Sequence, residues 1–597
     1  MILKALYDYY NRSDKVAPTG KEIKEIAFLI VIEQDGSFVR FEDTRNEEGN
    51  GNKYLVSKSW GRTGTTPQPF HFWDNFSYVL GFSKANIEIE KEELDDEKRK
   101  KLQKEISKNS KSHKGFVDYV KQMSEQHPDD MDIQAVASFY HNYENGLKSL
   151  LINSDKWDTI KKNLTKNLSF LIEGETEIIA SKERIIAYKS NEKIQEESGK
   201  SICLVTGERC SPIATFTKIK LGKYSDTKLM SFQKSSGYDS YGKEQGGNAP
   251  ISEEAEFKCS TALKKMLEYG SNNKFDVGNR TFVFWASSQS DEAKEVEESI
   301  FDMFYFSKDD DPDKGILKVK KSFETIYSGK SNFNKDGWFY IMGIYPANKA
   351  RIAVSYWSEL PLKVFVGFIL AHFKDMEIVC RFDNQNYLSL YSILKAVTFE
   401  RKIFGEDSNL QPNLAEAVVK SILQGLPYPF SLFSSCIRRI RAESGKEKDP
   451  IDTTRAAILK AYLNRINDNQ QKITVMLDKE NTNQGYLCGR LFAVLDKIQD
   501  DANRQHSIRE RYMNAASSTP AAVFATILNL SSHHSEKLNE GRKIFFEKIK
   551  QEIIDKISAD GFPAHLDLQD QGRFFVGYYH QMQDFYTKNN DEQISDN

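Results

Sequence analysis

The 597-residue chain has few of the residues that mark secreted, membrane-spanning or disulfide-bonded proteins. Its six cysteines are widely scattered and form no disulfide framework, which points to the cytoplasm. No apolar run approaches the roughly 20 residues that span a bilayer, so we expect no membrane segment. The net charge is only −3, so any nucleic-acid surface must be a local patch.

Residues with the spacing of a catalytic or metal site are also scarce. Cys203 and Cys210 have no second pair at zinc spacing, and structural zinc takes four ligands. The acidic segment 307–315 lacks the acid that a calcium loop needs at its twelfth position. No G-x-S-x-G, Walker A or H-E-x-x-H motif occurs. We therefore expect no catalytic residue, no metal and no cofactor. The alternative, a metal-dependent nuclease or RNA-processing subunit, would cleave nucleic acid in magnesium.

What the chain does contain is a change from mixed to purely helical patterning. Residues 26–42 are two β-rich runs joined by Asp35-Gly36, which suits a tight hairpin turn, and residues 53–60 predict a third strand. After about residue 358 the apolar spacing indicates amphipathic helices. The sequence therefore predicts an α+β protein, with mixed α/β N-terminal and middle regions followed by an all-helical C-terminal bundle. The expected domains are 1–200, 201–357, 358–475 and 476–597.

The middle region carries its own strand signals. Residues 279–287, "NRTFVFWAS", are typical of a buried strand. Residues 338–357 predict a strand pair that turns around Pro346-Ala347-Asn348. Pro250 and Ser252, followed by Glu253, Glu254 and Glu256, indicate the start of a helix.

Residues 58–81, "KSWGRTGTTPQPFHFWDNFSYVLG", join a basic loop to an aromatic segment. Cations and amides suit a loop that enters a groove of nucleic acid, and glycines let its backbone approach closely. The aromatic residues would hold such a loop in place. We expect the loop to bind something polyanionic. Ordinary surface charge is the alternative for Lys58 and Arg62, and packing in the core is the expected role of Phe72, Trp73 and Tyr78.

A second loop, residues 233–248, also combines glycines with amides, lysines and tyrosines. Amides can hydrogen-bond base edges, lysines hold phosphates, and tyrosines stack or wedge between bases. The candidate contacts are Lys234, Tyr241, Gln245 and Asn248. The alternative is a structured loop that packs between domains.

The segment from Glu88 to Lys114 separates its charges. It is acidic from Glu88 to Glu97 and basic from Lys98 to Lys114. One interpretation is a solvated helix with ion pairs along its surface. The other is a basic helix face that lies near a phosphate backbone.

An ordered set of motifs along the whole chain resembles a known family. The set includes "MILKALYDYY", "GRTGTTPQPFHFWDNFSYVLG", "SYGKEQGGNAPISEEAEF", "GIYPANKARIAVSYW" and "PNLAEAVVKSILQGLPYPFSLFSSCIRRIRAE". In this order they resemble the large subunit of type I-C CRISPR Cascade, the Csd-type member of the Cas large-subunit superfamily. Two places depart from the family pattern. "FTKIK" at 216–220 lacks the usual histidine-proline, and residues 85–115 match poorly.

The resemblance implies a binding subunit rather than an enzyme. Such subunits recognise the protospacer-adjacent motif (PAM) in target double-stranded DNA, help to open the duplex and stabilise the R-loop. The implied partners are the crRNA, the Cascade backbone subunits, the subunit that binds the crRNA 5′ end, and the helicase-nuclease. A purely structural subunit without DNA contacts is a further alternative. In the first loop the implied DNA contacts are Lys58, Arg62, Thr63, Gln68 and Asn75.

The C-terminal part of such subunits resembles the small subunit of related complexes and can be made alone from an internal start. Met476 stands just before a helix that begins near Gln484, so residues 476–597 are the expected second product. The segment 507–519 is predicted to link two helices. In it Arg509 and Arg511 are candidate contacts to a displaced or target strand, and surface ion pairing is the alternative.

Overall fold

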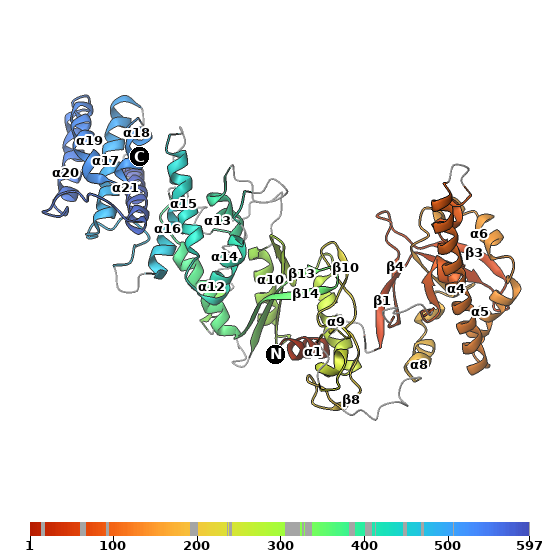
Figure 1. Cartoon of the computed structure of the whole chain (residues 1–597). Coiled ribbons are helices and arrows are strands. Elements are labelled where there is room, and N and C mark those ends of the chain that lie inside the picture. Colours follow the sequence, from red (N-terminus) through yellow and green to blue (C-terminus); the bar gives the residue numbers. More distant parts are fainter. Residues whose placement is uncertain are drawn as a thin grey trace. The chain divides into compact units, whose positions relative to one another are not determined.

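The chain forms two compact units, each with its own core. The N-terminal unit comprises residues 1–265 and 346–352, and the C-terminal unit comprises residues 266–345 and 353–597. The finer division into four domains stays a prediction. The computed structural model (Figure 1) describes every residue except 14–17, 19, 60–66, 91–94, 192–200, 236, 238–240, 305–322, 325–326, 329–336, 381–387, 400–408, 412, 446–449, 467–470, 505–506 and 596–597.

The N-terminal unit is built on a four-stranded sheet. Strand β2 is buried along its whole length, because it pairs with a strand on either side: antiparallel with β3 and parallel with β6. The predicted hairpin is confirmed: Gly36 has a φ of 85°, and the Asp35 carboxylate accepts a hydrogen bond from the Ser37 amide at 2.8 Å. The strand order is β3 (Phe38–Asp43), β2 (Phe28–Ile32), β6 (Asn167–Ile172) and β5 (Trp73–Asn75).

The predicted third strand exists but pairs elsewhere. Strand β4 (Asn52–Ser57) forms an antiparallel ribbon with β1 (Lys21–Ile26), outside the four-stranded sheet. Both edges of β2 are already occupied, and a turn closed by hydrogen bonds between Asn46 and Asn50 directs β4 back onto β1.

Helices of the same unit cover the sheet (Figure 1). Helix α4 (Asp96–Gln126) is capped by Asp95, whose carboxylate accepts from the Lys98 amide at 2.7 Å. Its C-terminal half buries Phe116, Val120 and Met123, and it packs on α2 (Phe76–Val79) and α5 (Met131–Asn142). The charge-segregated segment is therefore helical from Asp96 to Lys114, as both interpretations of it required, and its residues 91–94 lie outside the described residues.

A smaller cluster joins the first helix to the middle of the sequence. Helix α1 (Ile2–Arg12) lies on α9 (Glu253–Leu267), where the rings of Tyr10 and Phe257 meet edge to face at 5.7 Å. The predicted start of α9 is confirmed, because the Ser252 hydroxyl accepts from the Ala255 amide at 3.2 Å. Two short hairpins lie beside this cluster: β7 (Ser201–Ile202) with β8 (Arg209–Cys210), and β9 (Ile219–Leu221) with β10 (Tyr224–Thr227).

The C-terminal unit begins with a second four-stranded sheet. The predicted buried strand is confirmed as β12, and the predicted strand pair as β13 and β14. Their turn lies at Lys349-Ala350, three residues later than expected, because the Asn348 side chain accepts from the Ala350 amide at 2.9 Å and closes the turn there. The strand order is β11 (Lys274–Val277), β12 (Arg280–Ala286), β13 (Trp338–Asn348) and β14 (Arg351–Pro361), with α10 (Asp291–Phe304) packed on it.

Beyond Pro361 the described residues contain helices and no strands. This confirms the predicted α+β class and the helical C-terminal part. One continuous core runs from the sheet through all of them. They are α12 (Leu362–Met376), α13 (Leu390–Val397), α14 (Leu414–Gln424), α15 (Phe430–Glu443), α16 (Thr453–Ile466), α17 (Gln484–Asn503), α18 (Ser507–Ala516), α19 (Pro520–Ser535), α20 (Glu540–Ile554) and α21 (Leu568–Ser595).

Helices α17 and α21 approach each other through glycines. A Cβ atom added at Gly489 would lie 1.9 Å from the carbonyl oxygen of Phe574, and one at Gly577 would lie 2.3 Å from that of Tyr486. Helix α21 is also tied to earlier helices: the Tyr579 hydroxyl lies 2.8 Å from the Val379 carbonyl oxygen, and Gly572 lies against the ring of Phe433. Helix α21 therefore contacts residues that precede Met476 in the sequence as well as residues that follow it.

Across the described part of the chain, we find no helix that combines the length and the apolar character needed to cross a bilayer.

Candidate nucleic-acid interface

The first predicted loop is held at both of its ends. Residues 60–66, with Arg62 and Thr63, lie outside the described residues, so the structure gives no position for these two candidate contacts. The flanking residues are well defined. On the N-terminal side the chain leaves strand β4, where the Lys58 amide donates to the Gly20 carbonyl at 2.8 Å and the Ser59 amide donates to the Glu22 carboxylate at 2.6 Å.

Lys58 itself forms a buried ion pair with α9. Its Nζ lies 3.1 Å from the Glu256 carboxylate and 4.6 Å from the centre of the Phe257 ring. The two charged side chains are only 7% and 2% exposed. The ammonium therefore faces the protein, and a DNA contact by Lys58 would require this pair to open.

Glu256 is the centre of a small polar network. Its carboxylate accepts from the Thr217 amide at 2.8 Å and from the Ser260 hydroxyl at 2.5 Å, besides pairing with Lys58. Burial raises the pKa of Glu256, but the charge of Lys58 and these hydrogen bonds outweigh it and hold the pKa below its usual value. The carboxylate is thus stabilised in its charged form, which fixes strand β4 to helix α9.

The C-terminal end of the first loop is fixed against α4. Pro67 packs so closely on Gly115 that an added Cβ there would lie 2.6 Å from the proline Cβ. His71 lies 2.5 Å from the Tyr119 hydroxyl and 2.6 Å from the Ile185 carbonyl oxygen. Gln68, another candidate contact, is exposed between these two anchors.

The aromatic root of the loop is buried at Phe72 and Trp73 as predicted, whereas Tyr78 is half-buried. Phe72 and Trp73 are fully buried, and the rings of Phe70 and Trp73 stack at 4.7 Å. Phe72 has a φ of 59°, a left-handed conformation that is unusual for a bulky residue. Asn75 caps α2, because its side-chain oxygen accepts from the Ser77 amide at 3.0 Å. The role that the structure gives Asn75 is therefore helix capping.

The second loop presents one aromatic ring to solvent. The Tyr241 side chain is 101% exposed, and its φ is 53°. The candidate Lys234 is exposed too and pairs with Glu244 at 2.8 Å, a surface ion pair that contributes little to stability. The hydroxyphenyl group of Tyr241 is thus the most accessible candidate contact of this loop that the structure describes.

The base of the second loop is packed tightly. An added Cβ at Gly246 would lie 1.7 Å from the Ile213 carbonyl oxygen, so only glycine fits there. The flanking candidates Gln245 and Asn248 are half-buried in a short 3₁₀ helix, η3 (Gln245–Asn248), and the Asn248 amide donates to the Gln245 carbonyl at 3.0 Å.

Backbone strain concentrates in the two loops. Six described non-glycine residues have positive φ, and four of them lie in these segments: Phe72, Ser235, Tyr241 and Gln245. Each such conformation costs on the order of 1–3 kcal/mol, and strain of this kind is typical of functional sites. The two loops also share a support. The first loop leaves β4 and the second loop runs into α9, and the Lys58–Glu256 ion pair joins these two elements.

A group of exposed lysines was not predicted from the sequence. The tip of the β13–β14 hairpin continues the β9–β10 ribbon, because Lys228 exchanges backbone hydrogen bonds of 3.0 Å with Ala350 and Ile352. No local pattern links residues so far apart. The edge brings together four exposed lysines: Lys218, Lys220, Lys223 and Lys349. Lys218 pairs with Asp226 at 3.1 Å.

A sequence profile of the CRISPR-associated protein family Cas_Csd1 matches residues 6–586. The chain belongs to the Cas_Csd1 family of CRISPR-associated proteins. The resemblance seen in the sequence motifs is thereby confirmed. A search of curated proteins gives no match to the chain.

The two arginines predicted for this Cas_Csd1 protein differ in exposure. Residues 507–516 form helix α18 rather than a linker, so the expectation of an inter-helix segment was wrong. Arg509 is only 3% exposed, because its face of α18 carries Ile508 and Met513 into the core. Arg511 is exposed, with no hydrogen-bond or ion-pair partner among the described residues. Of the two, Arg511 alone is accessible to a nucleic acid strand.

The metal-ligating side chains of this Cas_Csd1 protein are dispersed. Within the described ranges no three His, Cys, Asp or Glu side chains come together as a metal site would need. Cys203 and Cys210 are both buried, in a cluster with Phe216 and Ile251. Burial raises the pKa of Cys203, but hydrogen bonds from Thr206 and Ser252 outweigh it and lower the pKa to about 7.

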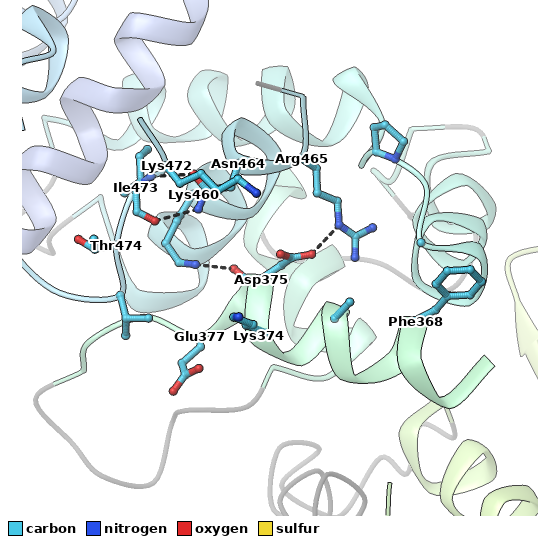
Figure 2. A pocket seen from close by; sticks show the side chains of 14 residues that line it. Phe368, Lys374, Asp375, Glu377, Lys460, Asn464, Arg465, Lys472, Ile473 and Thr474 are labelled. Atoms are coloured by element: carbon cyan, nitrogen blue, oxygen red, sulfur yellow. Dashed lines mark hydrogen bonds and ion pairs between the residues drawn. The ribbon is translucent and has the colours of Figure 1, made fainter. Parts of the chain in front are cut away.

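A cavity of about 780 Å³ lies in the C-terminal unit, between α12, α16 and residues 472–475 (Figure 2). Three of its charged groups contact one another or the backbone. Lys460 donates to the Asp375 carbonyl oxygen at 2.9 Å, and Arg465 Nε lies 2.5 Å from the Asp375 carboxylate. Burial lowers the pKa of Lys460. These contacts join α16 to the end of α12, so the polar wall of the cavity has a structural role.

Proposed function

We propose that this chain is the large subunit of a crRNA-guided type I-C CRISPR surveillance complex and reads the PAM in double-stranded DNA with its two strained loops. The observation that carries the proposal is the concentration of left-handed, non-glycine residues in these loops. Strained residues persist only where the surroundings fix them, and here the surroundings are the buried aromatic root and the Gly246 contact. The membership of the Cas_Csd1 family supports the same assignment.

The division of labour follows from the chemistry of the loops. Tyr241 is suited to stack on or wedge beside a base, because its ring is fully exposed. Gln68 supplies an amide for a base edge, and Lys234 supplies a charge for phosphates. The complex then opens the duplex, pairs the target strand with the crRNA, stabilises the R-loop and recruits the helicase-nuclease. The chain itself carries no catalytic step.

The test uses the assembled complex with crRNA and duplexes that carry a randomised PAM. Tyr241→Ala should weaken binding to the preferred PAM by about 1–3 kcal/mol, the value of one base–aromatic stack, and should reduce duplex opening. Tyr269→Ala is a matched control, because Tyr269 is equally exposed, at 105%, and lies outside both loops. Equal behaviour of the two variants would refute the role of the second loop.

The internal start at Met476 remains part of the proposal. Met476 is exposed, in the segment that precedes α17. Expression of the unaltered gene should yield a second product of 122 residues, from 476 to 597. Replacing the Met476 codon by a non-start codon should remove it and weaken interference. Detection of the full-length chain alone in the native host would contradict this part.

A further inference from the structure

Helix α4 carries a row of lysines that the two loops leave unexplained. Lys100, Lys104, Lys108, Lys111 and Lys114 are all exposed. Their spacing of three or four residues places them on one face, since an α-helix repeats every 3.6 residues. In the described part of the chain none of the five has an ion-pair partner, whereas Lys98 at the helix start pairs with Asp95 at 3.8 Å. We call these five residues the α4 lysine row.

The row is an external feature of the helix. The core-facing side of α4 is formed by Phe116, Val120 and Met123, which are fully or almost fully buried. Lysines three or four residues apart repel one another, which weakens a helix by a few tenths of a kcal/mol per pair, and only Glu105 and Asp118 lie within one turn of Lys108 and Lys114 to offset this. A polyanion that lies along the row would remove this repulsion.

The row ends at the first loop. Gly115 follows Lys111 by four residues and so continues the same row, and it is the residue on which Pro67 packs. Two residues before Gly115, the His113 ring lies 2.9 Å from the Tyr78 carbonyl oxygen, at the aromatic root. Pro67, the first described residue after the loop, therefore packs directly on the end of the row.

We propose that the α4 lysine row binds the phosphate backbone of the duplex that continues outward from the site read by the loops. This inference rests on the proposed function. The row spans about 21 Å from Lys100 to Lys114, because an α-helix rises 1.5 Å per residue. Along one DNA strand that length corresponds to roughly six phosphates, at one per 3.4 Å. Lysines form no directional base contacts there, so the row adds affinity without sequence preference.

The occupant is duplex DNA for reasons of shape and continuity. The row lies on one helix face over about four turns, so its charges form an elongated surface like that of a duplex backbone. Its Lys114 end also lies where a groove-binding loop would leave the DNA. An acidic protein segment or the crRNA is the competing occupant, and each gives a different result below.

The experiment compares two triple variants in the full complex. The test variant is Lys104→Gln, Lys108→Gln and Lys111→Gln. The control variant is Lys53→Gln, Lys84→Gln and Lys162→Gln, three exposed lysines of the same unit outside α4. Glutamine keeps the helix propensity of lysine, so the fold of α4 is preserved. Each complex is titrated with duplexes that share target and PAM but extend about 5 or about 25 base pairs beyond the PAM.

With the long duplex, raising salt from 50 to 200 mM should weaken the wild-type complex about 40-fold more than the test variant. This follows from three lost phosphate contacts at a log–log slope of about 0.9 each. Shortening the duplex should weaken the wild type and the control variant clearly more than the test variant, which keeps only Lys100 and Lys114 of the row. The ratio of affinities for correct and scrambled PAM should be equal in all three.

Two results would overturn the inference. If the test variant loses as much affinity as the wild type when the duplex is shortened, the row does not bind the flank. If the test variant fails to assemble with crRNA or other subunits, the row binds one of them instead. Failure of the proposed function looks different: the wild type would show no PAM preference, while its dependence on duplex length could persist.

Discussion

Removing Lys58 should destabilise the N-terminal unit far more than removing an ordinary surface lysine. Lys58→Met keeps the length of the side chain over Phe257 but leaves Glu256 charged and buried. Breaking a buried pair from one side costs about 3–5 kcal/mol. Glu256 keeps its hydrogen bonds from Thr217 and Ser260, so we expect the lower end, about 3 kcal/mol.

The double variant Lys58→Met, Glu256→Gln should recover most of this loss. Glutamine keeps a side-chain oxygen for the Thr217 amide and carries no charge that needs a partner. We expect the double variant to lie within about 1 kcal/mol of the wild type, so that it recovers about 2 of the 3 kcal/mol lost in Lys58→Met. Because the pKa of Glu256 is lowered in the fold, its contribution is present at neutral pH and is lost as the pH falls through that lowered value.

The assay is native-state hydrogen exchange read by mass spectrometry, because a two-unit chain does not unfold as a single transition. Peptides from β4 and α9 should lose protection in Lys58→Met and regain it in the double variant. Unchanged protection in Lys58→Met, or no recovery in the double variant, would refute the reasoning. DNA binding of the stable double variant then decides the second role of Lys58: restored binding means that it is no DNA contact.

Three further predictions concern both units. Burial, the largest cause, lowers the pKa values of His372 and His580 to about 3, so their neutral forms favour the fold. When the pH falls from 6.5 to 5, each histidine should reduce the stability of the C-terminal unit by about 1.6 kcal/mol, measured by hydrogen exchange of peptides from α12 and α21. Gly489→Ala should destabilise the α17–α21 contact by at least about 2 kcal/mol, whereas Gly541→Ala, which meets only one side-chain atom at 3.7 Å, should be neutral or stabilising in thermal unfolding. Gly246→Ala should impair PAM-dependent binding but leave assembly with crRNA intact, and loss of assembly would make the second loop a structural strut.

Local patterns predicted those elements that local patterns determine. The turn at Asp35-Gly36, the buried strand β12 and the helices after Pro361 follow from turn chemistry and apolar periodicity. The start of α9 was also predictable, because a serine cap and early acids lie within one helical turn. The burial of Phe72 and Trp73 was predictable because both carry large aromatic side chains within an aromatic segment.

Contacts between residues far apart in the sequence could not be predicted. Lys58 and Glu256 are 198 positions apart, and nothing near either residue indicates the other. The pairing of β4 with β1 could not be predicted for a similar reason, since a short strand can pair with several others and its local sequence does not select one. Arg509 was taken for a surface charge because charged residues are rarely buried, and the packing of α18 decided otherwise.

The attachment of α21 has a consequence for any shorter product of the gene. A chain that starts at Met476 would carry α21 but leave behind Phe433 and Val379, which α21 contacts in the full-length protein. The face around Gly572 and Tyr579 would then be open to another occupant. In each full-length molecule the matching site is already filled by its own last helix. A separate copy therefore cannot dock there without displacing that helix, and it must cover its open face with a different subunit of the assembly or with a second copy of itself.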